Sequence, residues 1–373
     1  MECSAFLMRY LIVIIGTGLS GATCARSLAE EGCSVVLLEK RNHFAGNAFD
    51  RCDDAGIRVH DYGPHLFHTN SDRVLEFLSR LTTWQFYEHR VLASVDGMLV
   101  PMPINRSTIN QFYGSSLDDA GIERFIEQQR IPRSPIETSE DHLWNSIGPD
   151  LCDKFFRGYS RKQWGLDLSE LSASVAARIP FRTNDDDRYF TDKYQFMPTD
   201  GYTAMIANML DHPNIEVQLE TDFFDIRDSL RYDHLIYTGP IDQFFDYRFG
   251  PLPYRSLRFE HVHIPDCERF QPAAQINYPN DFDYTRVTEF KQITGQTHSG
   301  TSIVREYPQA TGEPYYPIPR RENEELCQLY RAEAAKLDNV SFVGRLAQYR
   351  YYNMDQAVAA ALKLSDQLIA RYR

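Results

Sequence analysis

The chain has 373 residues, of which 43% are hydrophobic and 24% charged, and its formal net charge is −13. This length predicts two or three domains with a sizeable core. The negative charge argues against binding to nucleic acid or to an anionic membrane, because both repel an acidic surface. A small anionic ligand remains compatible with it where a few arginines converge.

The seven cysteines are scattered and form no CxxC pair, which favours reduced thiols in the cytoplasm over a disulfide framework. No run reaches the roughly 18 apolar residues of a membrane span. The opening MECSAFLMRYLIVII has neither a basic start nor a small-residue cleavage site, so we interpret it as a first strand and not as a signal peptide. We expect a cytoplasmic protein with no membrane partner and no metal site.

The first elements follow a strand–turn–helix–strand order. Leu11–Ile15 reads as a buried parallel strand, residues 16–21 as a turn that opens a helix, and Ser34–Leu38 as a second strand. From about residue 72 amphipathic helices alternate with polar loops, and residues 105–175 look mostly helical.

Later segments predict a second sheet and a return to the first domain. FEHVHI, AAQINY, YTRVTEF and TSIVREY alternate apolar and polar residues, which predicts antiparallel strands. HLIYTGP and VSFVGR predict two more strands of the first domain, and Met354–Tyr372 predicts a closing helix. We therefore predict an α/β fold with a discontinuous Rossmann-type domain at 8–77, 200–240 and 322–373, an inserted helical domain at 105–178, and an antiparallel sheet domain at 78–104, 179–199 and 241–321.

Gly16, Gly18 and Gly21 match the GxGxxG fingerprint between the first strand and the helix. The first glycine permits a tight turn, the second lets a pyrophosphate approach the backbone, and the third lets helix and strand pack closely. Glu39, at the end of the second strand, can accept hydrogen bonds from an adenosine ribose. Together these features predict a dinucleotide site rather than an ordinary turn.

The residues after Glu39 favour FAD over NAD. EKRNHFAGNAF is similar to an extension in FAD proteins where a glycine pair and a polar residue follow the acid; here Ala45-Gly46 takes the place of the pair and Asn47 follows. Near the C-terminus, FVGRLAQYRYYNMDQAVAAALK is a strand, a glycine and a loop that leads into a helix. The positive end of such a helix would stabilise an anionic reduced flavin by ~0.3–2 kcal/mol. The alternative is a plain packing helix.

Eight strings make a more specific resemblance. YGPHLFHT, FFRGYSRKQWG, ARIPFRTNDDDRYFTDKYQ, YTGPIDQFFDYRFGPLPYRSL, YTRVTEFK, EYP, EPYYPIP and GRLAQYRYYNMDQ occur in this order. Together they resemble the bacterial UDP-galactopyranose mutase family from about residue 10 to the end. The resemblance implies a homodimeric isomerase that serves the biosynthesis of cell-wall polysaccharide from a nucleotide sugar.

The family's chemistry uses reduced FAD with no net redox change, and NAD(P)H only as an external reductant. Flavin N5 attacks the anomeric carbon of UDP-galactopyranose and expels UDP. The sugar opens, recloses through its 4-hydroxyl as a furanose, and UDP returns. The protein must hold a diphosphate beside N5 and exclude water.

The resemblance also assigns roles to single residues. Arg178, on a mobile loop at the end of the helical domain, and Arg286, on the sheet, match a diphosphate clamp, and each guanidinium can donate two parallel hydrogen bonds worth roughly 1.5–3 kcal/mol each. With them, the catalytic set implied is Arg178, Arg286, Tyr315, Tyr351 and His68. His65 and His68 would flank the reactive face of the flavin as orienting, polar groups rather than as acid–base catalysts.

Two larger sets follow from the same motifs. The substrate-binding residues implied are His89, Phe155 or Phe156, Tyr159, Trp164, Arg178, Tyr189, Asn277, Arg286, Tyr315 and Tyr351, with Tyr159 and Trp164 as the uridine platform. The cofactor-binding residues implied are Gly16, Gly18, Leu19, Ser20, Gly21, Glu39, Lys40, Asn47, His65, Leu66, Asp222, Phe223, Arg345, Tyr352, Asn353 and Met354.

Three positions depart from the family pattern. Asn353 stands where the family usually has aspartate, Phe196 where it has glycine, and Ser160 where it has threonine. The first two are compatible with drift or with another sugar, such as UDP-N-acetylgalactosamine, UDP-arabinopyranose or dTDP-fucose. Because the uridine motifs look intact, UDP-galactose stays the first expectation.

Two other functions compete with the mutase. A redox flavoenzyme similar to amine oxidases would share the FAD core, but it would have no use for paired arginines or a uridine platform. A protein that binds FAD and UDP without turnover would be explained by the changes at Asn353 and Phe196.

Overall fold

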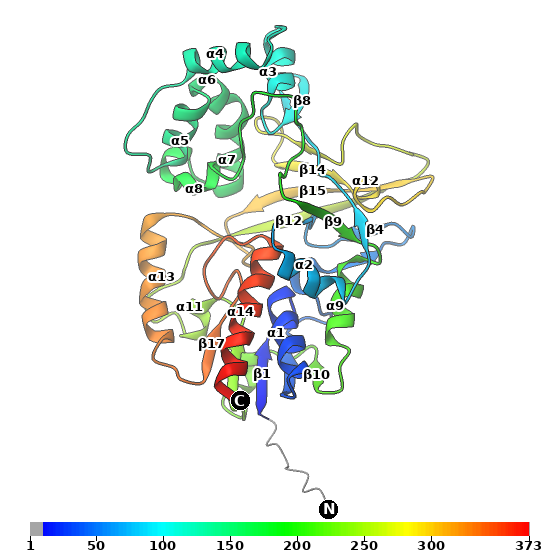
Figure 1. The fold of residues 1–373 in the computed structure, drawn as a ribbon, viewed down its shortest axis with the longest axis vertical. Helices are drawn as coiled ribbons and strands as arrows, with labels where there is room; N and C mark the ends of the chain where they lie inside the picture. The colour runs from blue at the N-terminus through cyan, green and yellow to red at the C-terminus, as the bar shows by residue number, and fades with distance from the viewer. Residues whose placement is uncertain (1–9, 373) are drawn as a thin grey trace, which may run out of the picture.

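The computed structural model describes residues 10–372, and its elements are stacked in three tiers (Figure 1). A helical tier lies at the top, a large sheet lies in the middle, and a Rossmann-type tier at the bottom carries the last helix. The part of the predicted first strand that falls on residues 1–9 lies outside the described residues. The predicted domain limits stay a prediction.

The bottom tier is a five-stranded parallel sheet assembled from separate stretches of the chain. In spatial order its strands are β10 (Ile215–Gln218), β2 (Ser34–Leu38), β1 (Leu11–Ile15), β11 (His234–Tyr237) and β17 (Val340–Phe342). The predicted bounds of β1 and β2 are confirmed, and HLIYTGP and VSFVGR supply β11 and β17 as predicted.

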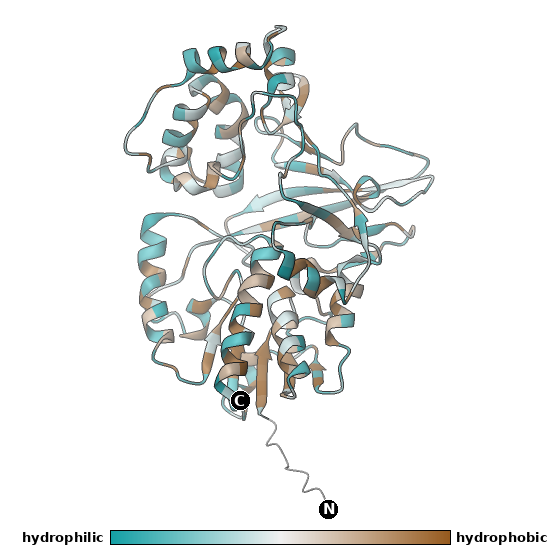
Figure 2. Ribbon diagram, viewed as in Figure 1, coloured by the Kyte–Doolittle hydropathy of each residue, from teal (hydrophilic) through white to brown (hydrophobic). Residues whose placement is uncertain are grey.

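Helix α1 (Leu19–Glu30) packs against α14 (Met354–Tyr372) and α9 (Gly201–Leu210). The predicted bounds of the closing helix are also confirmed. Ile12, Leu28 and Val358 are fully buried here, because small residues on the inner face of α1 let the helix approach the sheet. Figure 2 shows β1 as hydrophobic, as expected for a strand buried on both faces.

The middle tier is a seven-stranded sheet. In spatial order its strands are β16 (Tyr316–Pro317), β12 (Tyr254–Ile264), β15 (Thr301–Gln309), β14 (Arg286–Glu289), β13 (Gln275–Asn277), β7 (Val91–Val95) and β8 (Met98–Met102). Every pair is antiparallel except β13 with β7, which is parallel. The prediction of an antiparallel sheet is thus corrected at this pair. Here the hairpin of β7 and β8 pairs with β13, which comes much later in the chain.

The top tier is helical, as predicted for residues 105–175, and its buried residues, such as Ile109 and Leu143, share one core with residues of β7 and β8. Its helices are α3 (Arg106–Tyr113), α4 (Asp119–Gln129), α5 (Ser139–Ser146), α6 (Pro149–Cys152), the π-helical turn η2 (Asp153–Arg157), α7 (Gly158–Trp164), the 3-10 turn η3 (Leu168–Glu170) and α8 (Ala173–Ala176). Asn105 and Thr138 begin α3 and α5 with capping boxes, which satisfy backbone N–H groups at the first turn.

Short elements join the tiers. Strand β9 (Tyr194–Pro198) lies between β5 (Phe67–Thr69) and β6 (Trp84–Phe86) in a small antiparallel sheet. The remaining elements are the 3-10 turn η1 (Gly46–Ala48), the hairpin β3 (Asp50–Cys52) and β4 (Arg58–His60), and the helices α2 (Asp72–Ser79), α10 (Phe223–Ile226), α11 (Ile241–Phe244), α12 (Phe290–Thr294) and α13 (Arg321–Ala334).

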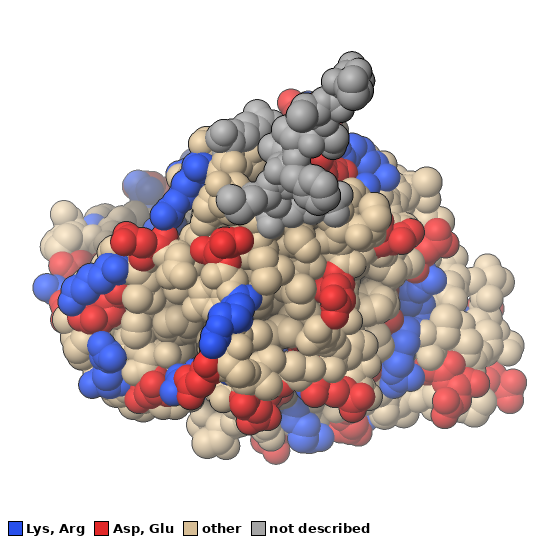
Figure 3. Space-filling model, turned by 90° about the horizontal axis from the view of Figure 1, so that it is seen from below, with Lys and Arg blue, Asp and Glu red and all other residues tan. Residues whose placement is uncertain are grey.

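On the face of the bottom tier seen from below, acidic and basic side chains are interspersed (Figure 3). That face therefore presents no continuous basic surface where it is visible. Within residues 10–372, no helix combines the length and apolar character needed to cross a membrane.

Candidate active site

Two adjoining pockets lie where the tiers meet. The dinucleotide pocket is lined by the glycine turn, the end of β2, residues 45–48 and 221–224, and the start of α14. The central pocket, of about 490 Å³, is lined by α7, the segment 175–192, β14 and the same start of α14, a size ordinary for a small-molecule site. The pockets share His65, Arg345 and residues 352–354.

The glycine turn is built from backbone that has no room for side chains. A Cβ on Gly21 would lie 2.0 Å from the carbonyl oxygen of Gly16, and Gly16 itself has φ +95°. Gly46, with φ +55°, approaches Gly18 so closely that its Cβ would lie 2.9 Å from the Gly18 Cα. Helix α1 begins at this bare surface without a side-chain cap. Its N–H groups and positive end suit a pyrophosphate, so the residues present fit a dinucleotide cofactor.

Glu39 is buried at the end of β2 and held by its neighbours. Its Oε2 accepts from the backbone N–H of Thr17 at 3.1 Å and from the Thr17 hydroxyl at 2.8 Å, and its Oε1 accepts from the N–H of Arg41 at 3.1 Å. A carboxylate has about four acceptor positions, so it can still bind the ribose hydroxyls of an adenosine.

The dinucleotide pocket is also lined by an ion pair that the sequence did not reveal. Arg41 donates to Glu313 at 2.6 Å and to the Asn47 side chain at 3.1 Å, and its guanidinium lies 4.4 Å from the Tyr62 ring centre. Glu313 comes from the loop after β15, so this contact joins two tiers. No local pattern connects residues this far apart in the chain.

Fifteen of the predicted cofactor residues line the dinucleotide pocket, namely Gly16, Gly18, Leu19, Ser20, Gly21, Glu39, Lys40, Asn47, His65, Asp222, Phe223, Arg345, Tyr352, Asn353 and Met354. Leu66 instead lines the central pocket. His65, its neighbour in the chain, lines both pockets.

Arg286 lines the central pocket in a two-fold contact with Glu306. Its Nε donates to Oε1 at 2.7 Å and its Nη2 to Oε2 at 2.8 Å. Burial alone would lower the pKa of Arg286, but the Glu306 carboxylate, itself 1% exposed, raises it well above its ordinary value. Because Glu306 occupies the Nε side of the fork, the Nη1 side remains to donate to a phosphate.

Arg178 reaches the same pocket from the segment after α8. Its Nη1 donates to the Tyr351 carbonyl at 2.9 Å, its Nη2 donates to Asn353 Oδ1, and its guanidinium lies 4.0 Å from the Tyr351 ring centre. The structure thus brings together the two arginines that the sequence singled out, although they are far apart in the chain.

An aromatic wall faces these arginines. Trp164, Tyr316 and Tyr351 lie with ring centres 5.2–6.4 Å apart, and Tyr159 lines the same pocket. Tyr315, predicted among the catalytic and substrate-binding residues, lines the dinucleotide pocket, with its ring centre 5.6 Å from that of Phe259. Its neighbour Tyr316 lines the central pocket.

The central pocket includes one of the two phenylalanines predicted as alternatives, and its lining residues do not include Asn277. Phe155 is buried in the helical core, while Phe156 lines the central pocket. Asn277 is buried and its Oδ1 accepts from Gln275 at 2.8 Å; Gln275, not Asn277, lines the pocket. Residues two apart on a strand face the same side, and the hydrogen bond joins Asn277 to Gln275 at the pocket wall.

Three histidines line the central pocket. Burial lowers the pKa of His65 and of His89 to about 3, so both are neutral at physiological pH. His89 Nδ1 lies 2.9 Å from the Tyr87 hydroxyl. His68 lies on β5 with its Nδ1 2.9 Å from Asp192 Oδ2, a partner that sequence analysis did not identify.

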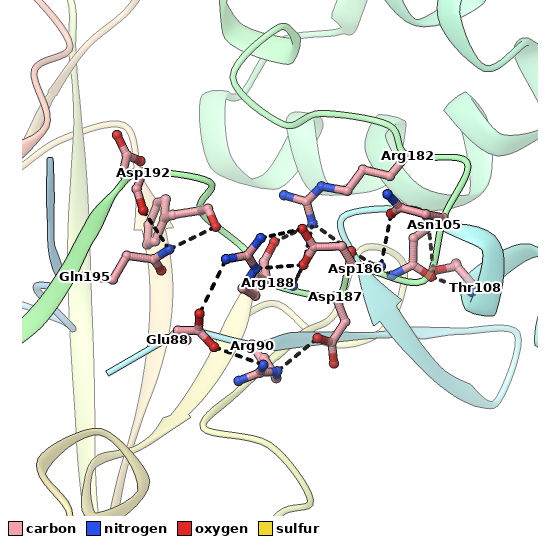
Figure 4. A network of polar contacts seen from close by, with 12 residues as sticks. Glu88, Arg90, Asn105, Thr108, Arg182, Asp186, Asp187, Arg188, Asp192 and Gln195 are labelled. Carbon is pink, nitrogen blue, oxygen red and sulfur yellow. Dashed lines mark hydrogen bonds and ion pairs between the residues drawn. The ribbon is translucent and has the colours of Figure 1, made fainter. Parts of the chain in front are cut away.

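The segment that leads from Arg178 to the histidine wall is held by a polar network (Figure 4). Arg188 makes two hydrogen bonds of 2.9 Å with Asp186, and Arg182 donates to the Asp186 carbonyl at 2.7 Å. Just beyond this network, Tyr189 and Asp192 line the central pocket. The network therefore fixes the chain on one side of Arg178.

The departures at Phe196 and Ser160 differ in position. Phe196 lies on β9 and packs against Trp84 and Phe86, with ring centres 5.9 and 6.4 Å away, and it lines neither pocket. Ser160 lines the central pocket, and its hydroxyl donates to the Leu166 carbonyl at 3.3 Å.

The chain matches two family models. Residues 154–351 match the model of UDP-galactopyranose mutase, and residues 14–81 match that of an NAD(P)-binding Rossmann-like domain. The chain is 40% identical over 369 residues to a protein from Klebsiella pneumoniae named "Probable UDP-galactopyranose mutase". This alignment covers 96% of the present chain and 94% of the relative. It is 38% identical over 371 residues to a dTDP-fucopyranose mutase from Escherichia coli, with 96% and 98% covered.

The fold also matches a crystal structure of reduced UDP-galactopyranose mutase, with a TM-score of 0.79 at 18% identity. The match covers 98% of this chain and 95% of the other. At this identity the likeness bears on the fold alone. The match to the Rossmann-like model agrees with a dinucleotide-binding role for the glycine turn.

Proposed function

Because the chain belongs to the UDP-galactopyranose mutase family, we propose that it is an isomerase that interconverts UDP-galactopyranose and UDP-galactofuranose. The observation that carries the proposal is the central pocket. Arg178, Arg286 and an aromatic wall converge there, directly beside a pocket that fits FAD. A redox enzyme acting on a small amine has no use for this combination.

The two arginines bind the diphosphate. Both are guanidinium groups with N–H donors turned to one pocket, and charge-assisted hydrogen bonds to phosphate are about twice as strong as neutral ones. When bound, reduced FAD supplies a nucleophile, its N5, for the anomeric carbon. The arginines stabilise the negative charge that develops on the diphosphate as it leaves, and they retain it for the return step.

The aromatic residues bind the nucleoside and exclude water. Tyr159, Trp164 and Phe156 come from α7 and the π-helical turn before it, and they form the part of the pocket that suits a uracil ring. Tyr316 and Tyr351 line the same pocket as Arg286 and Arg178, which supports a role for both tyrosines in binding the phosphates. Neutral His65 and His89 add polar contacts without a charge that would compete with the arginines.

A second candidate is the same reaction on another nucleotide sugar. The relative named dTDP-fucopyranose mutase is nearly as similar as the one named for UDP-galactopyranose. Asn353, which departs from the family pattern, lines both pockets and contacts Arg178. Three other nucleotide sugars should therefore be compared with UDP-galactopyranose as substrates, namely UDP-N-acetylgalactosamine, UDP-arabinopyranose and dTDP-fucose.

The test is a product assay on purified protein reconstituted with FAD and reduced with dithionite. We expect the reduced protein to convert UDP-galactopyranose to the furanose, as read by chromatography, and the oxidised protein to be inactive. Faster conversion of dTDP-fucose would establish the second candidate. Net oxidation of a substrate without isomerisation would refute the mutase and indicate a redox flavoenzyme. Binding of FAD and UDP without any turnover would indicate a binding protein.

A further inference from the structure

A chain of hydrogen bonds determines which nitrogen of His68 carries the proton. It begins at the backbone N–H of Lys193, which donates to Asn70 Oδ1 at 2.8 Å. A backbone N–H can only donate, so the amide oxygen of Asn70 must face Lys193. The Asn70 NH2 group therefore faces Asp192, and it donates to Oδ1 at 2.8 Å.

The other oxygen of Asp192 faces the histidine. Asp192 Oδ2 lies 2.9 Å from His68 Nδ1, and a carboxylate can only accept. In the singly protonated form of the ring, Nδ1 therefore carries the proton, and Nε2 has a free lone pair. A carboxylate that holds one ring nitrogen in this way selects the tautomer of the whole ring.

Both partners are held in place. The His68 ring stacks on Phe190 with centres 3.7 Å apart and planes within 14°. Gln195 Nε2 donates to the carbonyls of Phe190 and Asp192, each at 3.2 Å (Figure 4). His68 is buried but lines the central pocket, and no described hydrogen bond uses its Nε2. This nitrogen is thus available to a ligand.

We propose that Asp192 is a positioning residue that holds His68 with Nε2 turned to the pocket as the acceptor for a hydroxyl group of the sugar. The assignment of the ligand rests on the proposed function. His65, three residues before His68, borders both pockets, so this wall lies at the cofactor side, where the reacting sugar must be. The lone pair of His68 Nε2 can accept a hydrogen bond from a sugar hydroxyl, whereas a methyl group at the same position offers no donor.

The isosteric variant Asp192→Asn tests the tautomer. The Asn70 NH2 group still needs an acceptor, so the new amide keeps its oxygen toward Asn70 and turns its NH2 toward His68. Nδ1 must then accept, and Nε2 becomes a donor. We expect kcat/KM for the nucleotide sugar to fall about tenfold or more, while the affinity for UDP, which lacks the sugar, stays within about twofold of wild type.

A swapped pair supplies the rescue. In Asn70→Asp/Asp192→Asn, the carboxylate at 70 accepts from Lys193 N–H and from the new amide, so the amide oxygen at 192 faces His68 again. The double variant should recover most of the activity lost in Asp192→Asn. Asn70→Asp alone should be impaired, because it places two carboxylates together. This non-additive pattern is not expected from a merely structural role.

Nitrogen-15 NMR of labelled histidine reads the tautomer directly and without turnover, with His68 assigned by its absence in His68→Gln. Wild type and the double variant should carry the proton on Nδ1, and Asp192→Asn on Nε2. A wild-type protein that converts no nucleotide sugar would refute the proposed function. An active wild type whose Asp192→Asn variant keeps its kcat/KM, or keeps the Nδ1 proton, would overturn the present inference, as would a double variant that remains as impaired as Asp192→Asn.

Discussion

The dinucleotide pocket and the central pocket are built in different ways. The first is made largely of backbone from the glycine turn and the residues that follow it, with Glu39 as its main polar side chain. The second is made of side chains from α7, β14, the segment 175–192 and the start of α14. Each of its charged groups is held by a partner elsewhere, as Arg286 is by Glu306.

This difference separates what the chain must keep from what it can change. A pocket made of backbone depends on the absence of side chains, so a substitution acts through steric overlap. A pocket made of paired side chains depends on charges and hydrogen bonds, so one substitution can retune it and leave the fold intact. On the proposed function, the first pocket would hold the cofactor that the family shares, and the second would select the sugar.

The largest effect is expected in the glycine turn. In Gly21→Ala the new Cβ would lie 2.0 Å from the Gly16 carbonyl oxygen, which forces β1 and α1 apart. We expect this variant to lose its bound FAD and about 3 kcal/mol in free energy of unfolding. Flavin absorbance and denaturant unfolding of the apoprotein measure the two losses.

Gly18→Ala is the matched control. Its Cβ would meet nothing closer than the Gly46 Cα, at 3.8 Å, so the apoprotein should keep its stability within about 0.5 kcal/mol. The methyl group would still stand on the bare backbone surface and weaken FAD binding. Equal stability losses in the two variants would contradict the view that this pocket is formed by backbone packing.

The buried ion pair should give the next largest effect. Glu306→Gln keeps the shape but leaves Arg286 without its counter-charge. We expect a loss of about 3 kcal/mol in stability, the lower end for breaking a buried pair, because the Arg286 side chain is 23% exposed. We also expect kcat/KM to fall more than tenfold. Chemical denaturation and steady-state kinetics test both.

A neighbouring pair provides the comparison for this variant. Glu260 binds Arg305 at 2.8 Å on the same sheet, with side chains 38% and 28% exposed. Glu260→Gln should therefore cost no more than about 1 kcal/mol and leave kcat/KM unchanged. If both glutamine variants lose equal stability, burial of Glu306 is not what matters.

The sequence predicted the first pocket better than the second, for a physical reason. The strands, the glycine turn and Glu39 are close in the chain, so local patterns define them. Glu306 becomes the partner of Arg286 only through the register of β14 and β15, which no local pattern encodes. The motif EPYYPIP likewise could not tell Tyr315 from Tyr316, because neighbours in extended backbone face opposite sides.

Arg178→Ala should lower kcat/KM by well over tenfold, since a lost charged hydrogen bond is worth about 1.5–3 kcal/mol. The FAD content should stay normal, because Arg178 lines only the central pocket. Arg178→Lys should not restore full activity, because lysine lacks the two parallel donors. Wild-type kinetics in Arg178→Ala would show that the diphosphate is bound without it.

The smallest effect is expected at Asn353. The guanidinium of Arg178 donates to Asn353 Oδ1, so Asn353→Asp would replace the neutral acceptor of this charged donor by a carboxylate and form an ion pair. A carboxylate would compete more strongly with the phosphate oxygens for the same N–H groups.

The size of this effect is limited because Arg178 is exposed, and exposed ion pairs are worth only ~0.2–1 kcal/mol. We therefore expect KM to rise by no more than about fivefold, equally for UDP-galactose, UDP-N-acetylgalactosamine and dTDP-fucose. The rise should shrink near 0.5 M salt, because screening weakens exposed pairs. A change in the preference among the three sugars, unaffected by salt, would show instead that Asn353 contacts the sugar itself. The second candidate function would then gain its first direct support at a single residue.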